Sequence, residues 1–354
     1  MRLTRIRHWA AISILALSTV FASTAFALET FRHKETKTFD VGVSPTIDLE
    51  SISGDVSYIG TEGTTATVEI VIEIQADDAA EAHEIRSHLE LIVEGESGFL
   101  EARMADSRKF YEWLRDEYSR KHYVTVGFNV TGPRGAEGTA ISVSGNASVE
   151  DMAGPVEVSS VSGNASAIDI EKAVQANSVS GNVDVREVGG RVIAGSVSGD
   201  VMVVGCQSDL DMESTSGNAS AKDVDGSLTV ETVSGDIDAR AVAGSIDAES
   251  VSGSIWVENR EGMVRASTTS GDIDVRTRST GDVDLESSSG SVDLAVDPDG
   301  FGSVYLSASS GDVESDLPIK VRRQSDGHIE GTLGTGTARL RVTTNSGDIV
   351  VNEL

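Results

Sequence analysis

The sequence predicts an all-β protein, a single-chain β-solenoid (β-helix) in which each 18-residue rung contains two nonapeptides. The phrase Ser-x-Ser-Gly-[Asp/Asn/Ser]-apolar places a glycine every 18 residues, at Gly145, Gly163, Gly181, Gly199, Gly217, Gly235, Gly253 and Gly271. A second glycine bisects most of these units, at Gly154, Gly190, Gly226, Gly244 and Gly262. Apolar and polar residues alternate around these glycines, which indicates short strands. A repeat of this length buries its apolar face only by stacking on its neighbours.

The apolar residues two, four and seven places after each glycine are expected to face inward, as in Ile246, Ala248 and Val251. The glycine itself is expected to permit a close approach between backbones. Cys206 stands seven places after Gly199, so we predict a buried thiol that fills space rather than a nucleophile or a metal ligand.

The chain begins with a predicted secretory signal peptide at residues 1–27. Arg2, Arg5 and Arg7 precede the apolar run 9–21, and Ala25-Phe-Ala27 predicts cleavage after Ala27. The alternative, an uncleaved anchor, is disfavoured because the run is shorter than the roughly 20 residues that cross a bilayer. The mature chain is expected to contain no transmembrane segment. The protein is therefore expected in the periplasm, outside the cell or at its surface.

Residues 28–140 are predicted to form N-terminal strands and a capping region with two short helices. One helix should start at Asp78-Ala-Ala-Glu81, which has the spacing of a capping box, and the other should span 107–118. An isolated copy of the repeat at Ser51-Ile-Ser-Gly-Asp-Val56 predicts the first rung. Residues 141–290 are the predicted regular solenoid, and 291–354 the irregular C-terminal rungs and cap, closed by Ser346-Gly-Asp-Ile.

The chain is strongly acidic, with a formal net charge of −29. This charge argues against nucleic-acid partners and against simple adsorption to an anionic membrane. Acidic residues at outward positions of a solenoid are explained by solvation, and a specific cation-binding role is the alternative.

Aromatic and basic residues gather in one segment of the N-terminal region and form a candidate binding patch: Phe110, Tyr111, Trp113, Arg115, Tyr118, Arg120 and Lys121. Such a mixture suits a glycan, a lipid head group or a protein partner. The other interpretation is a cap over the open end of the solenoid, which every fold of this kind needs.

Pairs of hydroxyls flank the valine of each repeat and are predicted to point outward as a flat lattice: Ser142, Ser144, Ser160, Ser162, Ser178, Ser180, Ser196 and Ser198. A lattice of this kind could order water, bind ice or lie against a glycan. The alternative is that these small side chains pack and form hydrogen bonds along the ladder.

The sequence contains no recognisable catalytic or cofactor motif, so no catalytic residue, metal site or cofactor is predicted. The histidines show no metal-ligand spacing, and there is no nucleophile elbow or phosphate-binding loop. Calcium-binding β-rolls place Asp two residues after the last glycine of their repeat. Here Asp or Asn follows the glycine directly, so the calcium sites of that class do not carry over.

The repeated Ser-Gly-Asp/Asn-Val phrases, the leader, and the closing Leu333-Gly-Thr-Gly336 followed by Ser346-Gly-Asp-Ile resemble the bacterial β-strand-repeat proteins grouped as putative adhesins of unknown function. The resemblance implies a single-chain β-helix in the cell envelope. It implies no activity, because that family is defined by its architecture.

Three hypotheses for function follow. The first is a non-catalytic envelope or surface protein that acts as an adhesin or interaction scaffold, with an unidentified envelope protein or glycan as partner. The second is a carbohydrate-active β-helix enzyme, either a polysaccharide lyase or a glycosidase. The third is a calcium- or ice-associated repeat protein. The sequence leaves the partner and the oligomeric state undetermined.

Overall fold

The structure, a computed structural model, describes residues 28–118, 122–278 and 281–354. The predicted signal peptide at 1–27 lies outside the described residues, as do Arg120 and Lys121 of the aromatic segment. The chain divides into two compact units, Met1–Pro155 (unit 1) and Val156–Leu354 (unit 2). The predicted boundary at residue 140 stays a prediction.

Unit 1 contains nine strands and two helices in its described part. They are β1 (Glu29–Asp40), β2 (Thr46–Ser51), β3 (Val56–Thr61), β4 (Thr65–Ala76), α1 (Ala79–His88), β5 (Leu91–Glu96), β6 (Phe99–Met104), α2 (Ser107–Tyr118), β7 (Val124–Pro133), β8 (Glu137–Ser142) and β9 (Ala147–Met152). One sheet has the order β1-β4-β7-β3-β9 and the other the order β8-β2-β6-β5. Strands β1, β4 and β7 pair antiparallel, whereas β2 and β3 pair parallel with β8 and β9.

The isolated repeat copy does form a rung. Ser51 on β2 pairs with Ser142 on β8, and Val56 on β3 pairs with Ala147 on β9. The backbone N–H of Asn146 also donates to Asp55 Oδ1 at 2.8 Å. Strands β4 to β7 and both helices are therefore an insertion between two rungs that stack directly on each other.

Both predicted helices are present. The backbone N–H groups of Ala80 and Glu81 donate to Asp78 Oδ1 at 2.8 and 2.9 Å, which caps α1 as its sequence predicts. Ala82 and Ile85 of α1 are buried, as are Phe110 and Leu114 of α2. Each helix therefore buries the one apolar side that its periodicity predicts.

Unit 2 contains the regular repeats. Its elements are β10 (Val156–Ser160), β11 (Ala165–Ile170), β12 (Val174–Ser178), β13 (Val183–Val188), β14 (Val192–Ser196), β15 (Val201–Cys206), β16 (Leu210–Ser214), β17 (Ala219–Val224), β18 (Leu228–Thr232), β19 (Ile237–Val242), β20 (Ile246–Ser252), β21 (Ile255–Asn259), β22 (Val264–Ser270), β23 (Ile273–Thr277), β24 (Val283–Ser289), β25 (Val292–Val296), the 3-10 helix η1 (Pro298–Gly300), β26 (Phe301–Ser310), β27 (Val313–Ser315), β28 (Lys320–Ser325), β29 (His328–Thr332), β30 (Ala338–Ser346) and β31 (Ile349–Glu353).

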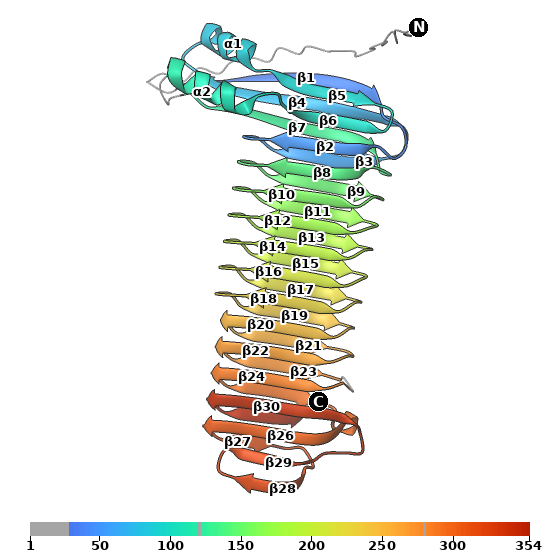
Figure 1. Cartoon of the computed structure of the whole chain (residues 1–354), viewed down its shortest axis with the longest axis vertical. Coiled ribbons are helices and arrows are strands. Elements are labelled where there is room, and N and C mark those ends of the chain that lie inside the picture. Colours follow the sequence, from blue (N-terminus) through green and yellow to red (C-terminus); the bar gives the residue numbers. More distant parts are fainter. Residues whose placement is uncertain (1–27, 119–121, 279–280) are drawn as a thin grey trace, which may run out of the picture. The chain divides into compact units, whose positions relative to one another are not determined.

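These strands form two sheets that are parallel from β10 to β25, confirming the all-β solenoid with 18-residue rungs (Figure 1). Sheet A of unit 2 contains the odd-numbered strands β11 to β25, then β31 and β27. Sheet B contains the even-numbered strands β10 to β24, followed by β30, β26, β29 and β28. Residues 18 apart pair directly, as Val183 does with Val201 and Val201 with Ala219. A side chain at one repeat position therefore lies beside its equivalents in the adjacent rungs.

The C-terminal rungs do not follow chain order. Strand β30 lies between β24 and β26, and β31 lies between β25 and β27, so the last rung in the sequence is inserted inside the stack. The prediction that Ser346-Gly-Asp-Ile closes the last rung is wrong for this reason. The stack instead ends in the antiparallel hairpin of β28 and β29, with β28 as the edge strand of sheet B.

The inward positions are partly as predicted. Residues two and four places after each repeat glycine are buried, but the seventh place differs between the two halves of a rung. In the first half, Val188 and Cys206 are 1% exposed, whereas in the second half Val197 and Val233 are 47% and 48% exposed. The prediction that the seventh place always faces inward is therefore wrong for the second half.

A single backbone feature causes this difference. In the first half of several rungs, the residue before the seventh place has a left-handed conformation, with φ of 52° at Glu187 and 76° at Gly205. This local bulge adds one residue and turns the next side chain inward. The second half keeps strict alternation, so its sixth residue, such as Ser196, faces inward and the following valine faces solvent.

The corner glycines permit the close stacking. A Cβ atom on Gly181, Gly199 or Gly217 would lie 2.1 Å from the carbonyl oxygen of the equivalent glycine one rung earlier. No side chain fits at that distance, so the predicted close backbone approach is confirmed.

We expect Gly217→Ala to destabilise the protein by about 3 kcal/mol, because the added methyl group would force adjacent corners apart. Thermal unfolding followed by circular dichroism measures this effect. Ser216→Ala, at the neighbouring exposed position, is the matched control and should leave the unfolding temperature unchanged. Equal stability of the two variants would contradict the corner packing.

A second prediction concerns Cys206, whose thiol donates to the carbonyl of Ser208 at 3.2 Å and whose pKa is raised by burial. Cys206→Val should change stability by less than about 1.5 kcal/mol, because it replaces one small apolar side chain with another. Cys206→Asp should cost several kcal/mol by placing a charge between the sheets. Rapid reaction of the native protein with a bulky thiol reagent would show that the inward assignment is wrong.

Candidate binding site

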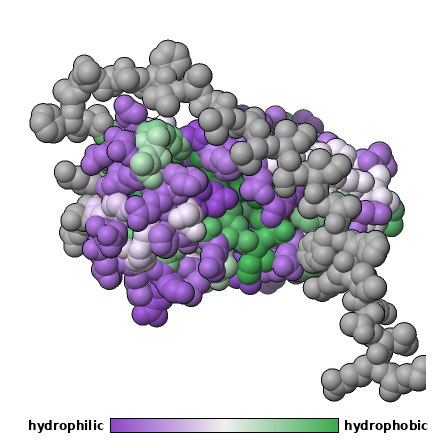
Figure 2. Space-filling view, turned by 90° about the horizontal axis from the view of Figure 1, so that it is seen from above, coloured by the Kyte–Doolittle hydropathy of each residue, from purple (hydrophilic) through white to green (hydrophobic). Residues whose placement is uncertain are grey.

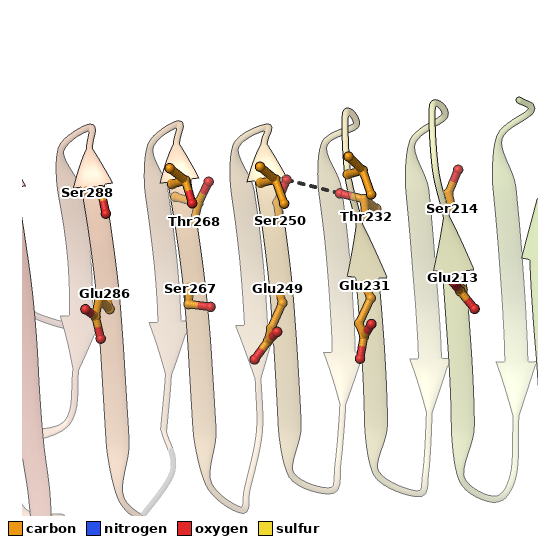
Figure 3. A pocket seen from close by; sticks show the side chains of 13 residues that line it. Glu213, Ser214, Glu231, Thr232, Glu249, Ser250, Ser267, Thr268, Glu286 and Ser288 are labelled. Atoms are coloured by element: carbon orange, nitrogen blue, oxygen red, sulfur yellow. Dashed lines mark hydrogen bonds between the residues drawn. The ribbon is translucent and has the colours of Figure 1, made fainter. Parts of the chain in front are cut away.

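A groove of about 440 Å³ runs over the outer face of sheet B in unit 2. Its lining comes from equivalent positions of β16, β18, β20, β22 and β24 and from Val233, which directly follows β18 (Figure 3). Because the strands are parallel and in register, each repeat position contributes one column of side chains across the strands. The groove therefore has a different kind of side chain on each of its sides.

One side of the groove is a column of glutamates. In each repeat the glutamate stands five residues after the bisecting glycine or the residue that replaces it. Glu213 pairs with Glu231, and Glu231 pairs with Glu249, on successive strands. The column continues through Ser267 to Glu286. In Figure 3 these side chains project from the same face of the sheet.

Three of these glutamates lack a compensating cation. Within the described part of the chain, Glu213, Glu231 and Glu249 take part in no ion pair, whereas Glu286 lies 3.9 Å from Arg341. Equivalent positions on neighbouring strands are about 4.8 Å apart, and like charges at that separation repel each other. A cationic group in the groove would relieve this repulsion.

The column beside the glutamates consists of hydroxyl side chains. Ser214, Thr232, Ser250 and Thr268 are buried one place after each member of the glutamate column. Thr268 Oγ1 donates to the carbonyl of Gly253 at 3.0 Å, and Thr232 Oγ1 lies 3.1 Å from Ser250 Oγ. These hydroxyls satisfy backbone groups at the corners. The groups that can contact a ligand are therefore the glutamates and the corner residues.

The rim of the groove is apolar. Val233 and Val251 follow the buried hydroxyls at the corners, and each is about half exposed to solvent. A partner that lies in the groove would cover these valines and meet the carboxylates at the same time. The groove can therefore bind an elongated group that is cationic on one side and apolar on the other.

The predicted outward hydroxyl lattice is wrong for one of its two columns. Ser142, Ser160, Ser178 and Ser196 are buried, whereas Ser144, Ser162, Ser180 and Ser198 are exposed. Strict alternation in the second half of each rung turns the first serine of each pair toward the corner backbone. Ser178 Oγ donates to the carbonyl of Gly163 at 2.8 Å and accepts from the N–H of Gly181 at 2.9 Å. This is the packing role weighed as the alternative, and only one exposed column of hydroxyls remains.

The Asn and Asp residues that follow the corner glycines also bond along the stack. Asn182 Oδ1 accepts from the backbone N–H of Asp200 at 3.0 Å, and Asp200 Oδ1 accepts from that of Asn218 at 2.9 Å. One oxygen of each side chain is thereby used by the next rung. Among the described residues, no group of three or more His, Cys, Asp or Glu side chains is arranged to hold a metal ion.

The aromatic segment packs largely on itself and on α1. Phe110 is buried, Trp113 stacks on His88 with ring centroids 3.9 Å apart, and Tyr118 meets the edge of Trp113. The Tyr111 hydroxyl donates to the carbonyl of Val124 at 3.3 Å, and burial raises its pKa to about 12. Arg115 is exposed. The structure thus brings the described aromatic residues together, and a ligand for this segment stays a proposal.

Two features of the outer faces were not predicted, although the sequence contains a signal for each. The glutamate column could have been found from the recurrence of Glu213, Glu231 and Glu249 at intervals of 18 residues. Trp256 is the only aromatic residue in the regular repeats, and it stands at an outward position of β21. The guanidinium of Arg240 lies 4.5 Å from the centroid of its ring and also bonds to Asp238.

These observations define the class: a parallel β-solenoid of tight, in-register rungs that presents repeated columns of side chains. The chain belongs to the Toastrack DUF4097 family, whose model matches residues 139–278 and 241–352.

Solved structures match the chain at low sequence identity and low TM-score. A putative adhesin from Parabacteroides merdae is 13% identical, with a TM-score of 0.33, and the match covers 74% of this chain and 95% of that one. A putative adhesin from Bacteroides fragilis is 14% identical, with a TM-score of 0.26 and coverage of 91% and 97%. A putative cell adhesion protein from Clostridium sporogenes is 8% identical, with a TM-score of 0.19 and coverage of 91% and 100%. Among curated proteins, none matches the chain.

Neither helix in the described residues has the length and apolar character needed to cross a membrane.

The buried hydroxyls give a direct test of the corner chemistry. Ser178→Ala should destabilise the protein by about 1–3 kcal/mol, because it leaves the Gly163 carbonyl and the Gly181 N–H without this partner. Ser180→Ala, two residues away and exposed, should change stability by less than about 0.5 kcal/mol. Urea unfolding of both variants measures the difference. Equally small losses in both variants would restore the outward lattice as the better description.

Proposed function

We propose that this protein is an exported, non-catalytic surface or envelope protein that acts as an adhesin or interaction scaffold. The observation that carries the proposal is the groove on sheet B, with its uncompensated glutamate column and apolar rim. Its repeated columns suit a long, shallow contact with another macromolecule. The predicted leader, which would direct the chain out of the cytoplasm, supports export.

The charge of the groove limits the class of partner. A column that contains Glu213, Glu231 and Glu249 attracts cations and repels anionic polymers. Val233 and Val251 add an apolar strip that a small cation would leave exposed. A basic, partly apolar surface of an envelope protein therefore fits the groove better than an acidic glycan does.

The solenoid face also suits binding better than the aromatic segment does. The rings of Phe110 and Trp113 are already engaged with neighbouring rings, and the Tyr111 hydroxyl is bonded to the backbone. Binding there would compete with the packing of α1 and α2. The groove glutamates and rim valines are exposed and require no rearrangement to meet a partner.

The carbohydrate-active enzyme is the alternative. Glycosidases use paired carboxylates in a site that orients the sugar and controls access of water. Glu231 and Glu249 form a pair on neighbouring strands, but both lie on an outer sheet surface bordered by short corners. No loop encloses them among the described rungs β10 to β25, so the geometry favours binding over hydrolysis.

A pull-down from envelope fractions tests the proposed function. Glu231→Gln/Glu249→Gln should reduce the captured partner at least tenfold, because it removes two charges from the centre of the column while keeping side-chain size. Glu157→Gln/Glu258→Gln removes the same charge outside the groove lining and is expected to bind like the wild type. Equal capture by both double variants would contradict the groove as the binding site. Release of reducing ends from an acidic polysaccharide, lost in the groove variant alone, would favour the enzyme.

A further inference from the structure

Sheet edges in both units leave backbone groups available for pairing. In unit 2, β28 is the last strand of sheet B, and in unit 1, β5 is the last strand of the sheet β8-β2-β6-β5. Strand β28 pairs only with β29, and β5 only with β6, among the described residues. Each edge thus exposes a row of N–H and C=O groups that can accept a further strand.

Strand β28 has an unusual composition for this acidic unit. All six of its residues are exposed, and Lys320, Arg322 and Arg323 make it basic. Arg322 is paired with Glu330 on β29, whereas Lys320 and Arg323 take part in no ion pair within the described part of the chain. Val321 is 49% exposed between them. The strand therefore presents two unpaired cations and an apolar side chain at an open edge.

Strand β5 has the complementary composition. Glu94 and Glu96 are exposed, and Leu91 and Ile92 are half-buried. Figure 2 views the molecule from above and shows hydrophobic residues at the centre with hydrophilic residues on either side of them. A strand added to β5 would meet carboxylates on one stretch and apolar side chains on the other.

The two remaining edges are poorer candidates. Strand β27 has only three residues, which offers little backbone for pairing. Strand β1 carries charges of both signs that are paired with its neighbour β4, through Arg32 with Glu73 and Lys34 with Glu69. Charges placed in this way protect an edge against pairing.

We propose that the protein self-associates by strand addition, with the β28 edge of one copy pairing with the β5 edge of another. Backbone hydrogen bonds between the two edges supply the contact, and the opposite charges select the partner edge. Pairing β28 with β28 would oppose cations, and pairing β5 with β5 would oppose carboxylates, so the symmetric contacts are disfavoured. The contact is heterologous: it leaves a free β5 edge on one copy and a free β28 edge on the other, which allows chains or rings of copies.

The net charge of the protein determines the ionic strength at which self-association should be measured. The copies carry a formal charge of −29 each and repel one another at low salt. At about 0.15 M salt the Debye length is roughly 8 Å, so this long-range repulsion is largely screened while charges in contact still attract. The experiment is therefore done near that ionic strength.

Sedimentation velocity over a concentration series, with charge-swapped variants, tests the proposal. The wild type should gain mass with increasing concentration. Glu94→Lys/Glu96→Lys makes both edges basic, and Lys320→Glu/Arg323→Glu makes both acidic, so each variant alone should stay monomeric. An equimolar mixture of the two should associate again, because every β5 edge then meets a β28 edge of opposite charge.

Controls separate this contact from general charge effects. Glu157→Lys/Glu258→Lys makes the same change in net charge as the β5 variant but lies on β10 and β21, outside both edges and the groove, and it should associate like the wild type. All variants should show the wild-type unfolding temperature. A wild type that stays monomeric at about 100 µM, well above ordinary micromolar affinities, overturns the proposal. So does a mixture of well-folded variants that fails to associate, or association that survives in either variant alone.

Discussion

The structure depends on the close approach of successive backbones at the rung corners. At Gly181, Gly199 and Gly217 an added Cβ would lie 2.1 Å from a carbonyl oxygen of the previous rung. Stacking at this distance keeps residues 18 positions apart in direct register through many strands. The inward columns of Val and Ala then form one continuous narrow core, which no single rung could bury alone.

The corners are stabilised by side chains that belong to the repeat phrase itself. The buried serine donates to the carbonyl of the preceding glycine corner and accepts from its own corner, as Ser196 does with Gly181 and Gly199. The Asn or Asp after the glycine accepts from the backbone N–H of the next rung. Two side chains of the phrase thus satisfy backbone groups that a tight turn would otherwise leave unpaired. The phrase is repetitive because each rung meets the same geometric requirement.

Because residues 18 positions apart are in register, any side chain that recurs at an outward position forms a column across the strands. One outward glutamate per rung becomes a charged column, and one exposed valine per corner becomes an apolar strip. Adjacent like charges in such a column lower the stability of the fold. The glutamate column nevertheless continues through three rungs before Ser267 interrupts it. Such a surface is consistent with selection for contact with a partner rather than for stability alone.

The sequence alone was enough to predict the solenoid, its 18-residue rung, both helices and the burial of Cys206, because periodicity reports directly which residues share a face. The sequence pattern gave the wrong orientation where one residue changed the alternation. A left-handed residue such as Glu187 turns the seventh position inward in one half of the rung, and its absence in the other half turns Ser196 inward and Val197 outward. Backbone φ at a single non-glycine residue has no reliable signature in a repeat.

Only the tertiary structure decided which distant segments lie together. It placed β2 and β3 directly against β8 and β9 across the inserted strands and helices, and it inserted β30 and β31 inside the C-terminal stack. It also showed that the exposed glutamates and the corner valines enclose one groove. Similar repeat phrases, such as those that end in Ser53-Gly54 and Ser346-Gly347, offer the same local pairing chemistry in every rung. The order of stacking is therefore set by the lengths and packing of the segments between them, which local patterns do not encode.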